Sequence, residues 1–247
     1  MKRLSAFLAL VALLFAGLAF ANTAIVTSST GTVQVKTGTA PARVLRTGDQ
    51  VRQGDTITTG PVSSAVLKFE DGQVAALTAN SRMTVTAYQY NPRTGGGSIL
   101  LSLIDGGMRA ITGLIGRRTP NNVAYRAASA TIGIRGTDVT IVTSQGNVVV
   151  TVTEGVISFA FPGRPAVTVP AGEGVNARTD GTFQQGAAQT IIQSLPADIQ
   201  SAIGGISTLS AAIQAAAAGT PATIVVPPSG TNTTTTTPAG GTGASGS

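Results

Sequence analysis

The residues best placed to do chemistry are two aspartates, Asp49 and Asp55, which directly follow Gly48 and Gly54. A nearby pair of carboxylates is the acid and base equipment of a glycoside hydrolase. The same pattern has a structural interpretation, because the carboxylate of a turn aspartate accepts hydrogen bonds from neighbouring backbone amides. No aromatic platform for a sugar accompanies the pair, and we therefore favour the structural interpretation.

A second candidate is the segment Arg-Gly-Thr at residues 135–137, between two predicted strands. The guanidinium of Arg135 offers paired donors to an anionic ligand. Alternatively, this guanidinium pairs with a turn carboxylate such as Asp49, Asp55 or Asp138, and the adjacent glycine permits the chain to bend. We favour the structural interpretation here as well.

The composition argues against several kinds of active site. The chain has no histidine, so a serine triad lacks its base. It has no cysteine, which excludes a thiolate metal site and a disulfide framework. The carboxylates do not follow the spacing of a calcium loop, and the glycines at residues 95–97 and 113–116 lack the lysine of a phosphate-binding loop. We expect no catalytic residue, no cofactor and no metal.

The charge of the chain is small and scattered. A formal net charge of +6 favours anionic partners such as lipopolysaccharide or nucleic acid. Charged residues are only 11% of the chain, however, and the longest basic run is Arg117-Arg118. The net positive charge is therefore the small difference between a few basic and a few acidic residues. We expect no nucleic-acid partner.

The N-terminus has the pattern of a secretory signal peptide over residues 1–21. A positive start is followed by an apolar run over residues 4–20 and by small residues, which predicts cleavage between Ala21 and Asn22. The alternative is a membrane anchor, but the run is shorter than the roughly 20 apolar residues that a span requires. No later segment is apolar enough to span a membrane. We expect an exported protein in the periplasm or outside the cell.

From about residue 24 to residue 178 the apolar residues alternate with polar ones, which indicates half-buried strands. Glycine-containing turns separate the strands, and Asp71-Gly72 predicts a tight hairpin. Residues 99–104 and 156–161 are apolar on both faces, which predicts strands between two layers or under a helix or loop. The pattern predicts an all-β fold and leaves open a sandwich, a β-roll or a short β-solenoid.

Beyond Gln184 the pattern becomes helical. Apolar residues at helical spacing predict one helix that Ser194 caps and Gly204-Gly205 ends, followed by a second, Ala-rich helix to Ala218. The predicted divisions are a signal peptide at 1–21, a β domain at 22–180, a helical segment at 181–228 that includes a short strand at 223–226, and a disordered tail at 229–247, which is too rich in Thr, Gly, Ser and Pro to fold.

Several segments, taken in order, resemble the FecR domain, a periplasmic module named for the ferric-citrate regulator. They are an opening strand at 31–35, paired Gly-Asp turns at 45–49 and 53–60, a hairpin at 65–76, a Leu-Thr-Ala-Asn-Ser turn at 77–81, a strand with embedded glycine at 103–109, the closing segment at 130–138, and turns at 154–156 and 171–172. The motif residues, which we expect to be structural, are Gly48, Asp49, Gly54, Asp55, Thr59, Gly60, Asp71, Gly72, Asn80, Ser81, Arg135, Gly136, Thr137 and Gly155.

The resemblance implies an all-β module in the cell envelope. The best-known members of that family relay a signal from an outer-membrane receptor to a sigma factor, through a cytoplasmic region and a transmembrane helix. Here a cleavable signal peptide stands in their place, so we do not expect the relay. We predict a non-enzymatic interaction or sensory module that binds an envelope protein or glycan. The alternative is a structural, self-associating surface protein, and a glycan-active enzyme is the less favoured third hypothesis.

Overall fold

The computed structural model describes residues 23–219. The predicted signal peptide at 1–21 with its cleavage site, the predicted strand at 223–226 and the predicted tail at 229–247 lie outside the described residues.

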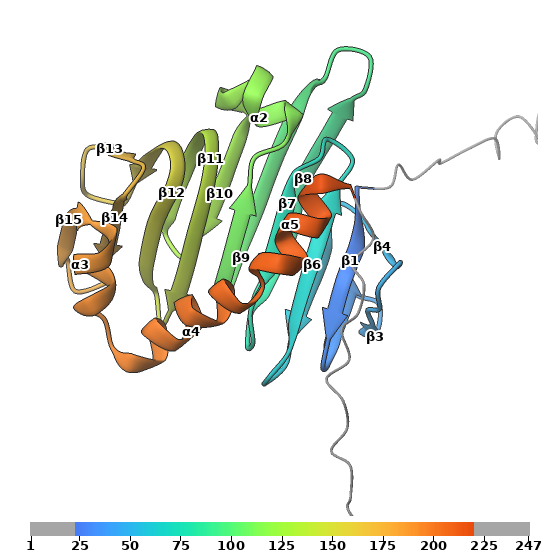
Figure 1. The fold of residues 1–247 in the computed structure, drawn as a ribbon, viewed down its shortest axis with the longest axis horizontal. Helices are drawn as coiled ribbons and strands as arrows, with labels where there is room; N and C mark the ends of the chain where they lie inside the picture. The colour runs from blue at the N-terminus through green and yellow to red at the C-terminus, as the bar shows by residue number, and fades with distance from the viewer. Residues whose placement is uncertain (1–22, 220–247) are drawn as a thin grey trace, which may run out of the picture.

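Strands make up most of the described chain, as expected for an all-β protein, and short helices follow them at the C-terminal end (Figure 1). The strands are β1 (Ala24–Thr30), β2 (Val33–Thr37), β3 (Arg43–Val44), β4 (Gln50–Val51), β5 (Asp55–Thr59), β6 (Ser64–Phe69), β7 (Val74–Leu77), β8 (Arg82–Asn91), β9 (Gly96–Ile111), β10 (Val123–Ala127), β11 (Ala130–Ser144), β12 (Asn147–Ala160), β13 (Val167–Pro170), β14 (Glu173–Ala177) and β15 (Phe183–Ala187). The helices are α2 (Leu114–Arg118), the 3-10 turn η1 (Pro120–Asn122), α3 (Ala188–Gln193), α4 (Ala197–Thr208) and α5 (Ser210–Ala218).

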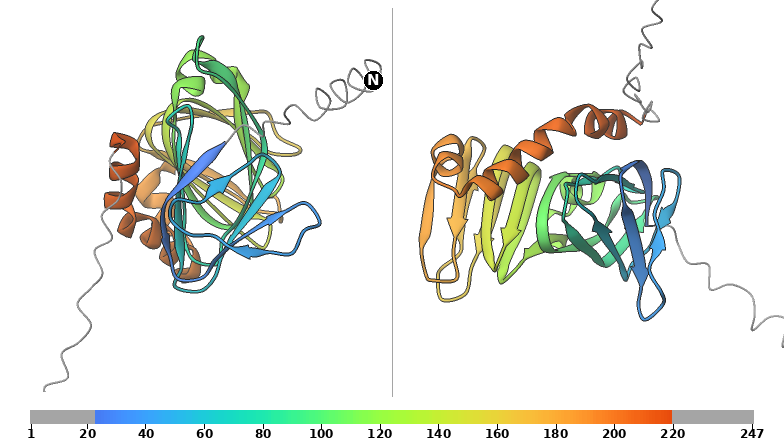
Figure 2. Two further views of the ribbon diagram at one scale, coloured as in Figure 1. Left: turned by 90° about the vertical axis from the view of Figure 1, so that its right-hand side faces the viewer. Right: turned by 90° about the horizontal axis from the view of Figure 1, so that it is seen from below.

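The strands form one mixed sheet that folds over on itself into two layers (Figure 2). Three long strands, β9, β11 and β12, pass from one layer to the other. The first part of β9 pairs with β8 and, in parallel, with β10, whereas its last part pairs with β7 and β11. We call the layer with β1, β6, β7, β14 and β15 the covered layer. We call the layer with β2, β5, β8, β10 and β13 the open layer.

The main core lies between the two layers. It is built from the alternate apolar side chains that point inward from both layers, and Tyr125, Phe69 and Phe159 are among its largest fully buried members. Burial of this apolar surface is the main favourable contribution to folding.

The C-terminal helices lie across the outer face of the covered layer (Figure 1). Ile206 of α4 packs with Val142 and Val149, and Ile213 of α5 packs with Val66. The strands beneath are therefore buried on both faces, as the uninterrupted burial of residues 74–77 and 148–152 shows. The helical pair thus packs on the β domain.

The prediction that residues 99–104 and 156–161 are buried on both faces is wrong. In residues 99–104 and 156–161, buried residues are interspersed with residues that are at least partly exposed, and Ile104 is 50% exposed. Both stretches belong to the open layer, and helices α3, α4 and α5 lie on the other layer. Apolar runs in the sequence could not show which layer the helices would select.

The boundaries in the C-terminal region also differ from the prediction. Strand β15 lies inside the predicted helical segment 181–228, so the sheet continues beyond residue 180. Ser194 does not cap the next helix, because it ends α3 and its hydroxyl donates to the carbonyl of Ile191 (2.7 Å). Helix α4 continues through Gly204-Gly205, because tertiary packing against the sheet outweighs the low helix propensity of glycine.

Within residues 23–219, no single helix is long and apolar enough to cross a membrane. Helices α4 and α5, taken together, have the length and apolar composition of a membrane-spanning segment, by length and composition only, and a bend of 44° separates them.

Candidate functional site

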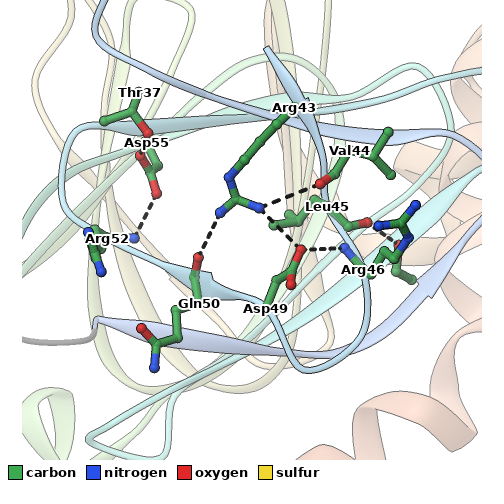
Figure 3. A network of polar contacts seen from close by, with 10 residues as sticks. Thr37, Arg43, Val44, Leu45, Arg46, Asp49, Gln50, Arg52 and Asp55 are labelled. Carbon is green, nitrogen blue, oxygen red and sulfur yellow. Dashed lines mark hydrogen bonds and ion pairs between the residues drawn. The ribbon is translucent and has the colours of Figure 1, made fainter. Parts of the chain in front are cut away.

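The first Gly-Asp turn, residues 46–49, is closed by its own aspartate (Figure 3). The backbone N–H of Arg46 donates to Oδ2 of Asp49 (2.9 Å), and the N–H of Asp49 donates back to the carbonyl of Arg46 (3.0 Å). Gly48 supplies the left-handed conformation of the turn, with φ of 91°. Arg43 adds an exposed ion pair to Asp49 at 3.2 Å.

The second turn, residues 52–55, repeats these contacts in a buried setting (Figure 3). The N–H of Arg52 donates to Oδ2 of Asp55 (2.8 Å), and the hydroxyl of Thr37 donates to Oδ1 of the same carboxylate. Gly54 takes the left-handed conformation here, with φ of 88°. Asp55 is only 2% exposed, so both of its oxygens are used by the protein itself.

The two turns line a shallow depression of about 430 Å³. Each aspartate in it accepts bonds from its own turn, and Asp49 also faces Arg43. Both carboxylates are thus occupied by contacts within the fold, and the residues that line the depression include no aromatic side chain on which a sugar could stack. The arrangement therefore serves to hold the turns.

Replacing these aspartates with alanine should have unequal effects. Asp55→Ala removes a buried carboxylate that accepts two hydrogen bonds, from the N–H of Arg52 and the hydroxyl of Thr37, and should lower the free energy of unfolding by about 2 kcal/mol. Asp49→Ala removes a partly exposed turn contact and an exposed ion pair and should cost about 1 kcal/mol or less. Urea unfolding followed by circular dichroism measures both losses of unfolding free energy. Equal losses, or a larger loss for Asp49→Ala, would contradict the greater burial of Asp55.

Three motif segments that are far apart in the sequence meet in a buried cluster of hydroxyl groups. The hydroxyl of Thr59 donates to the carbonyl of Thr78 (2.5 Å) and accepts the N–H of Ser81 (2.8 Å). The hydroxyl of Ser81 in turn accepts the N–H of Gly107 (2.9 Å) and lies 3.1 Å from its carbonyl oxygen. The cluster ties together the end of β5, the β7–β8 turn and the middle of β9.

The turn residues around this cluster have special backbone conformations. Asn80 has a φ of 54°, in the left-handed region that asparagine tolerates. Its N–H donates to the carbonyl of Gly60 (3.1 Å), and the N–H of Gly60 donates to Thr32 (2.9 Å). Gly106 has a φ of 86°, at the place where β9 changes layers.

The Arg-Gly-Thr segment forms the corresponding bend in β11. The β11–β12 register shifts between Arg135 and Asp138, and Gly136 has a φ of 58°. The N–H of Thr137 donates to the hydroxyl of Thr112 (2.8 Å). Opposite it, Gly155 has a φ of 78°, and a Cβ there would lie 2.2 Å from the carbonyl oxygen of Gly136.

The expected ion pair of Arg135 is wrong. Asp138 is held by Arg109 instead, whose Nε and Nη2 donate to its two oxygens at 2.8 and 2.6 Å. Within residues 23–219, neither an ion pair nor a hydrogen bond includes the guanidinium of Arg135, which is exposed. Sequence reasoning missed Arg109, because only the pairing of β9 with β11 brings it to Asp138.

The hairpin at Asp71-Gly72 forms as predicted, with Gly72 at a φ of 83°. Asp71 is buried, and its two oxygens accept the N–H groups of Gln73 (3.2 Å) and Ile115 (3.3 Å). Burial raises the pKa of this carboxyl above its ordinary value, and these hydrogen bonds offset the rise only in part. Burial and the nearby Asp71 charge also raise the pKa of Tyr88.

The raised pKa of Asp71 predicts a pH dependence of stability. The folded protein holds this proton at a pH where the unfolded chain, with an ordinary carboxyl near pH 4, has released it. The contribution of Asp71 to the free energy of unfolding should therefore fall as the pH rises from about 4 through the raised pKa. Urea titrations at several pH values measure the free energy of unfolding of the wild type and of Asp71→Asn. The value for the wild type minus the value for Asp71→Asn should fall as the pH rises, and a value that increases with pH would contradict the prediction.

Within the described part of the chain, histidine, cysteine, aspartate and glutamate form no group of three that could hold a metal ion.

Comparisons with known proteins find one family model that matches part of this chain. The family described as "FecR protein" matches residues 55–158, which begin at Asp55 and contain the hydroxyl cluster and the bends in β9, β11 and β12. Two crystal structures of a "putative anti-sigma factor" from Parabacteroides distasonis ATCC 8503, at 2.50 and 1.65 Å resolution, are similar. Each is 17% identical with a TM-score of 0.45, and the match covers 55% of this chain and 62% of that chain. A search of curated proteins finds no significant match.

Proposed function

We propose that this chain, which carries a FecR domain, is an exported, non-enzymatic interaction or sensory module of the cell envelope. The family match supports a sensory or regulatory module in general terms. Export, the absence of turnover and the envelope partner are our inferences from the sequence and the geometry.

The observation that carries the proposal is the use of the motif side chains within the fold. The carboxylates of Asp49, Asp55 and Asp71 accept bonds from turn amides, and Asp138 is paired with Arg109. Groups that are bonded in this way are not positioned to exchange protons with a substrate. A fold that uses its polar motif residues to hold bends leaves binding to its exposed surfaces.

The layers divide the surface into two unlike faces. The C-terminal helices cover the outer face of one layer (Figure 2). Strands β8 and β10 of the open layer, and the first part of β11, present alternate side chains to solvent. An exposed face supported by a rigid two-layer core suits recognition of a partner in the envelope.

Cell fractionation tests the export and the placement together. The protein, expressed in its own bacterium, should be recovered from the periplasm or the medium with Asn22 as its first residue, as N-terminal sequencing would measure. An Ala21→Asp variant, which spoils the small residue before the predicted cleavage site, should remain uncleaved. Recovery of the uncleaved wild-type chain in the cytoplasm would contradict the proposal.

A further inference from the structure

The exposed face of the open layer carries a continuous row of polar side chains. Successive strand pairings align these residues directly across six strands, from β2 to β11: Lys36, Thr56, Thr84, Ser102, Arg126 and Thr131. A hydrogen bond joins the hydroxyls of Thr56 and Thr84 within the row (2.8 Å), and another joins Ser102 of the row to Thr86 beside it (2.7 Å). The row gives this face hydrogen-bonding groups at regular strand spacing.

A groove of about 540 Å³ runs beside this row. Ala124, Gly133 and Ser158 are aligned across β10, β11 and β12, and they line the groove where larger side chains would fill it. Arg135 and the segment 120–121 of η1 also line it.

Gly133 keeps the groove open although the backbone does not require a glycine there. Its φ is not positive, and a Cβ at this position would lie 3.8 Å from Cβ of Ser158, which is ordinary contact. At Gly97, by contrast, a Cβ would lie 2.0 Å from the carbonyl oxygen of Gln89. A glycine inside a paired strand weakens the strand, and such a position often marks the close approach of a ligand.

The arginine side chains at the groove indicate the charge of its ligand. Its lining contains Arg135 and no acidic residue, and Arg126, two residues from Ala124, is exposed on the same face. The guanidinium of Arg135 has no partner within residues 23–219. Guanidinium groups bind carboxylate or phosphate through paired hydrogen bonds, so the groove suits an anion.

The type of donor favours a sugar polymer over a peptide. The strands under the groove are paired on both sides, β11 with β10 and β12, and β12 with β11 and β13. A peptide could not add a strand there and would lose the main-chain bonds of that recognition mode. The groove instead offers the hydroxyls of Thr131, Ser158 and Thr168 and the amide of Asn121.

We infer that this groove binds an acidic polysaccharide, whose sugars lie over Ala124 and Gly133 and whose carboxylates or phosphates contact Arg135 and Arg126. The inference rests on the proposed function and names its ligand class. The hydroxyl and amide groups of the lining bond the sugar hydroxyls.

Calorimetric titration of the full chain with polygalacturonate tests the inference, with neutral dextran and poly-glutamate as comparison probes. The wild type should bind polygalacturonate, and the affinity should fall with added salt. Arg135→Ala should weaken binding by about tenfold. Gly133→Val should weaken it by about tenfold or more, through filling of the groove, without lowering the melting temperature, because valine favours strands.

Two variants control for loss of charge and for loss of a glycine elsewhere. Arg46→Ala removes an exposed arginine from the 46–49 turn, and Gly186→Val fills a position in β15 where a Cβ would meet nothing within 4 Å. Both should bind as the wild type does. Binding that is unchanged in folded Gly133→Val and Arg135→Ala would overturn the groove as the site.

The remaining outcomes separate this inference from the proposed function. Binding of poly-glutamate without polygalacturonate would overturn the polysaccharide in favour of an acidic protein. Binding of neither probe would overturn the inference, whereas the proposed function would still stand or fall on export and on retention by cell envelopes.

Discussion

Replacing Gly106 with alanine will lower the free energy of unfolding by about 3 kcal/mol or more. Gly106 has a φ of 86°, where an alanine costs about 1–2 kcal/mol. The added Cβ would also lie 2.5 Å from Cα of Ser81 and 2.7 Å from the carbonyl oxygen of Asn80. These are backbone atoms of the β7–β8 turn, so the clash cannot be relieved by a rotamer change and adds roughly 1–3 kcal/mol.

Gly72→Ala is the matched control, because Gly72 has a similar φ of 83° but a Cβ there would meet nothing within 4 Å. It should cost only the conformational part, about 1–2 kcal/mol. Urea unfolding followed by far-ultraviolet circular dichroism suits a chain without tryptophan. Equal losses in the two variants would contradict the close contact between β9 and the hydroxyl cluster.

Replacing Arg109 with alanine will lower the free energy of unfolding by about 3 kcal/mol. The Asp138 side chain is only 10% exposed and takes two hydrogen bonds from the Arg109 guanidinium. Removal of one partner leaves the other charge poorly solvated, which is the costly way to break such a pair. The Asp138 hydrogen bond also raises the pKa of Arg109, so the arginine stays charged.

Arg178→Ala provides the comparison, because the Arg178–Asp180 pair is exposed at 44% and 56% of its side chains. Its loss should change the free energy of unfolding by less than about 1 kcal/mol. The double variant Arg109→Ala/Asp138→Ala should recover part of the loss, because no unpaired charge then remains. A single variant as stable as the wild type would show that the pair does not hold the β9–β11 contact.

Local patterns predicted much of the fold. Alternation of apolar residues indicated the strands, and Asp71-Gly72 indicated the β6–β7 hairpin that the structure contains. These features depend on neighbours in the sequence, and local chemistry determines them. The order of the glycine-containing motifs indicated a resemblance to the FecR domain, and the FecR family model matches residues 55–158.

Features that depend on the pairing of distant strands could not be predicted. The pair of Arg109 and Asp138 exists because β9 and β11 are aligned at that point, and the polar row on the open layer requires five successive registers. The C-terminal helices pack on the covered layer. Apolar stretches of the open layer, such as residues 99–104, are therefore at least partly exposed at every second residue. The sequence does not distinguish Gly133 from other strand glycines, because only the neighbouring strands show that its backbone leaves room for a side chain.

The central claim is that the motif residues hold the fold while an exposed surface binds the partner. Its most direct test is the retention of the double variant Asp49→Asn/Asp55→Asn on envelopes isolated from the producing bacterium, at a temperature where the wild type and the variant are both folded. The account predicts a lower melting temperature and an unchanged dissociation constant for the variant. A fully folded variant that no longer binds would contradict it, because the two turn aspartates would then act on the partner.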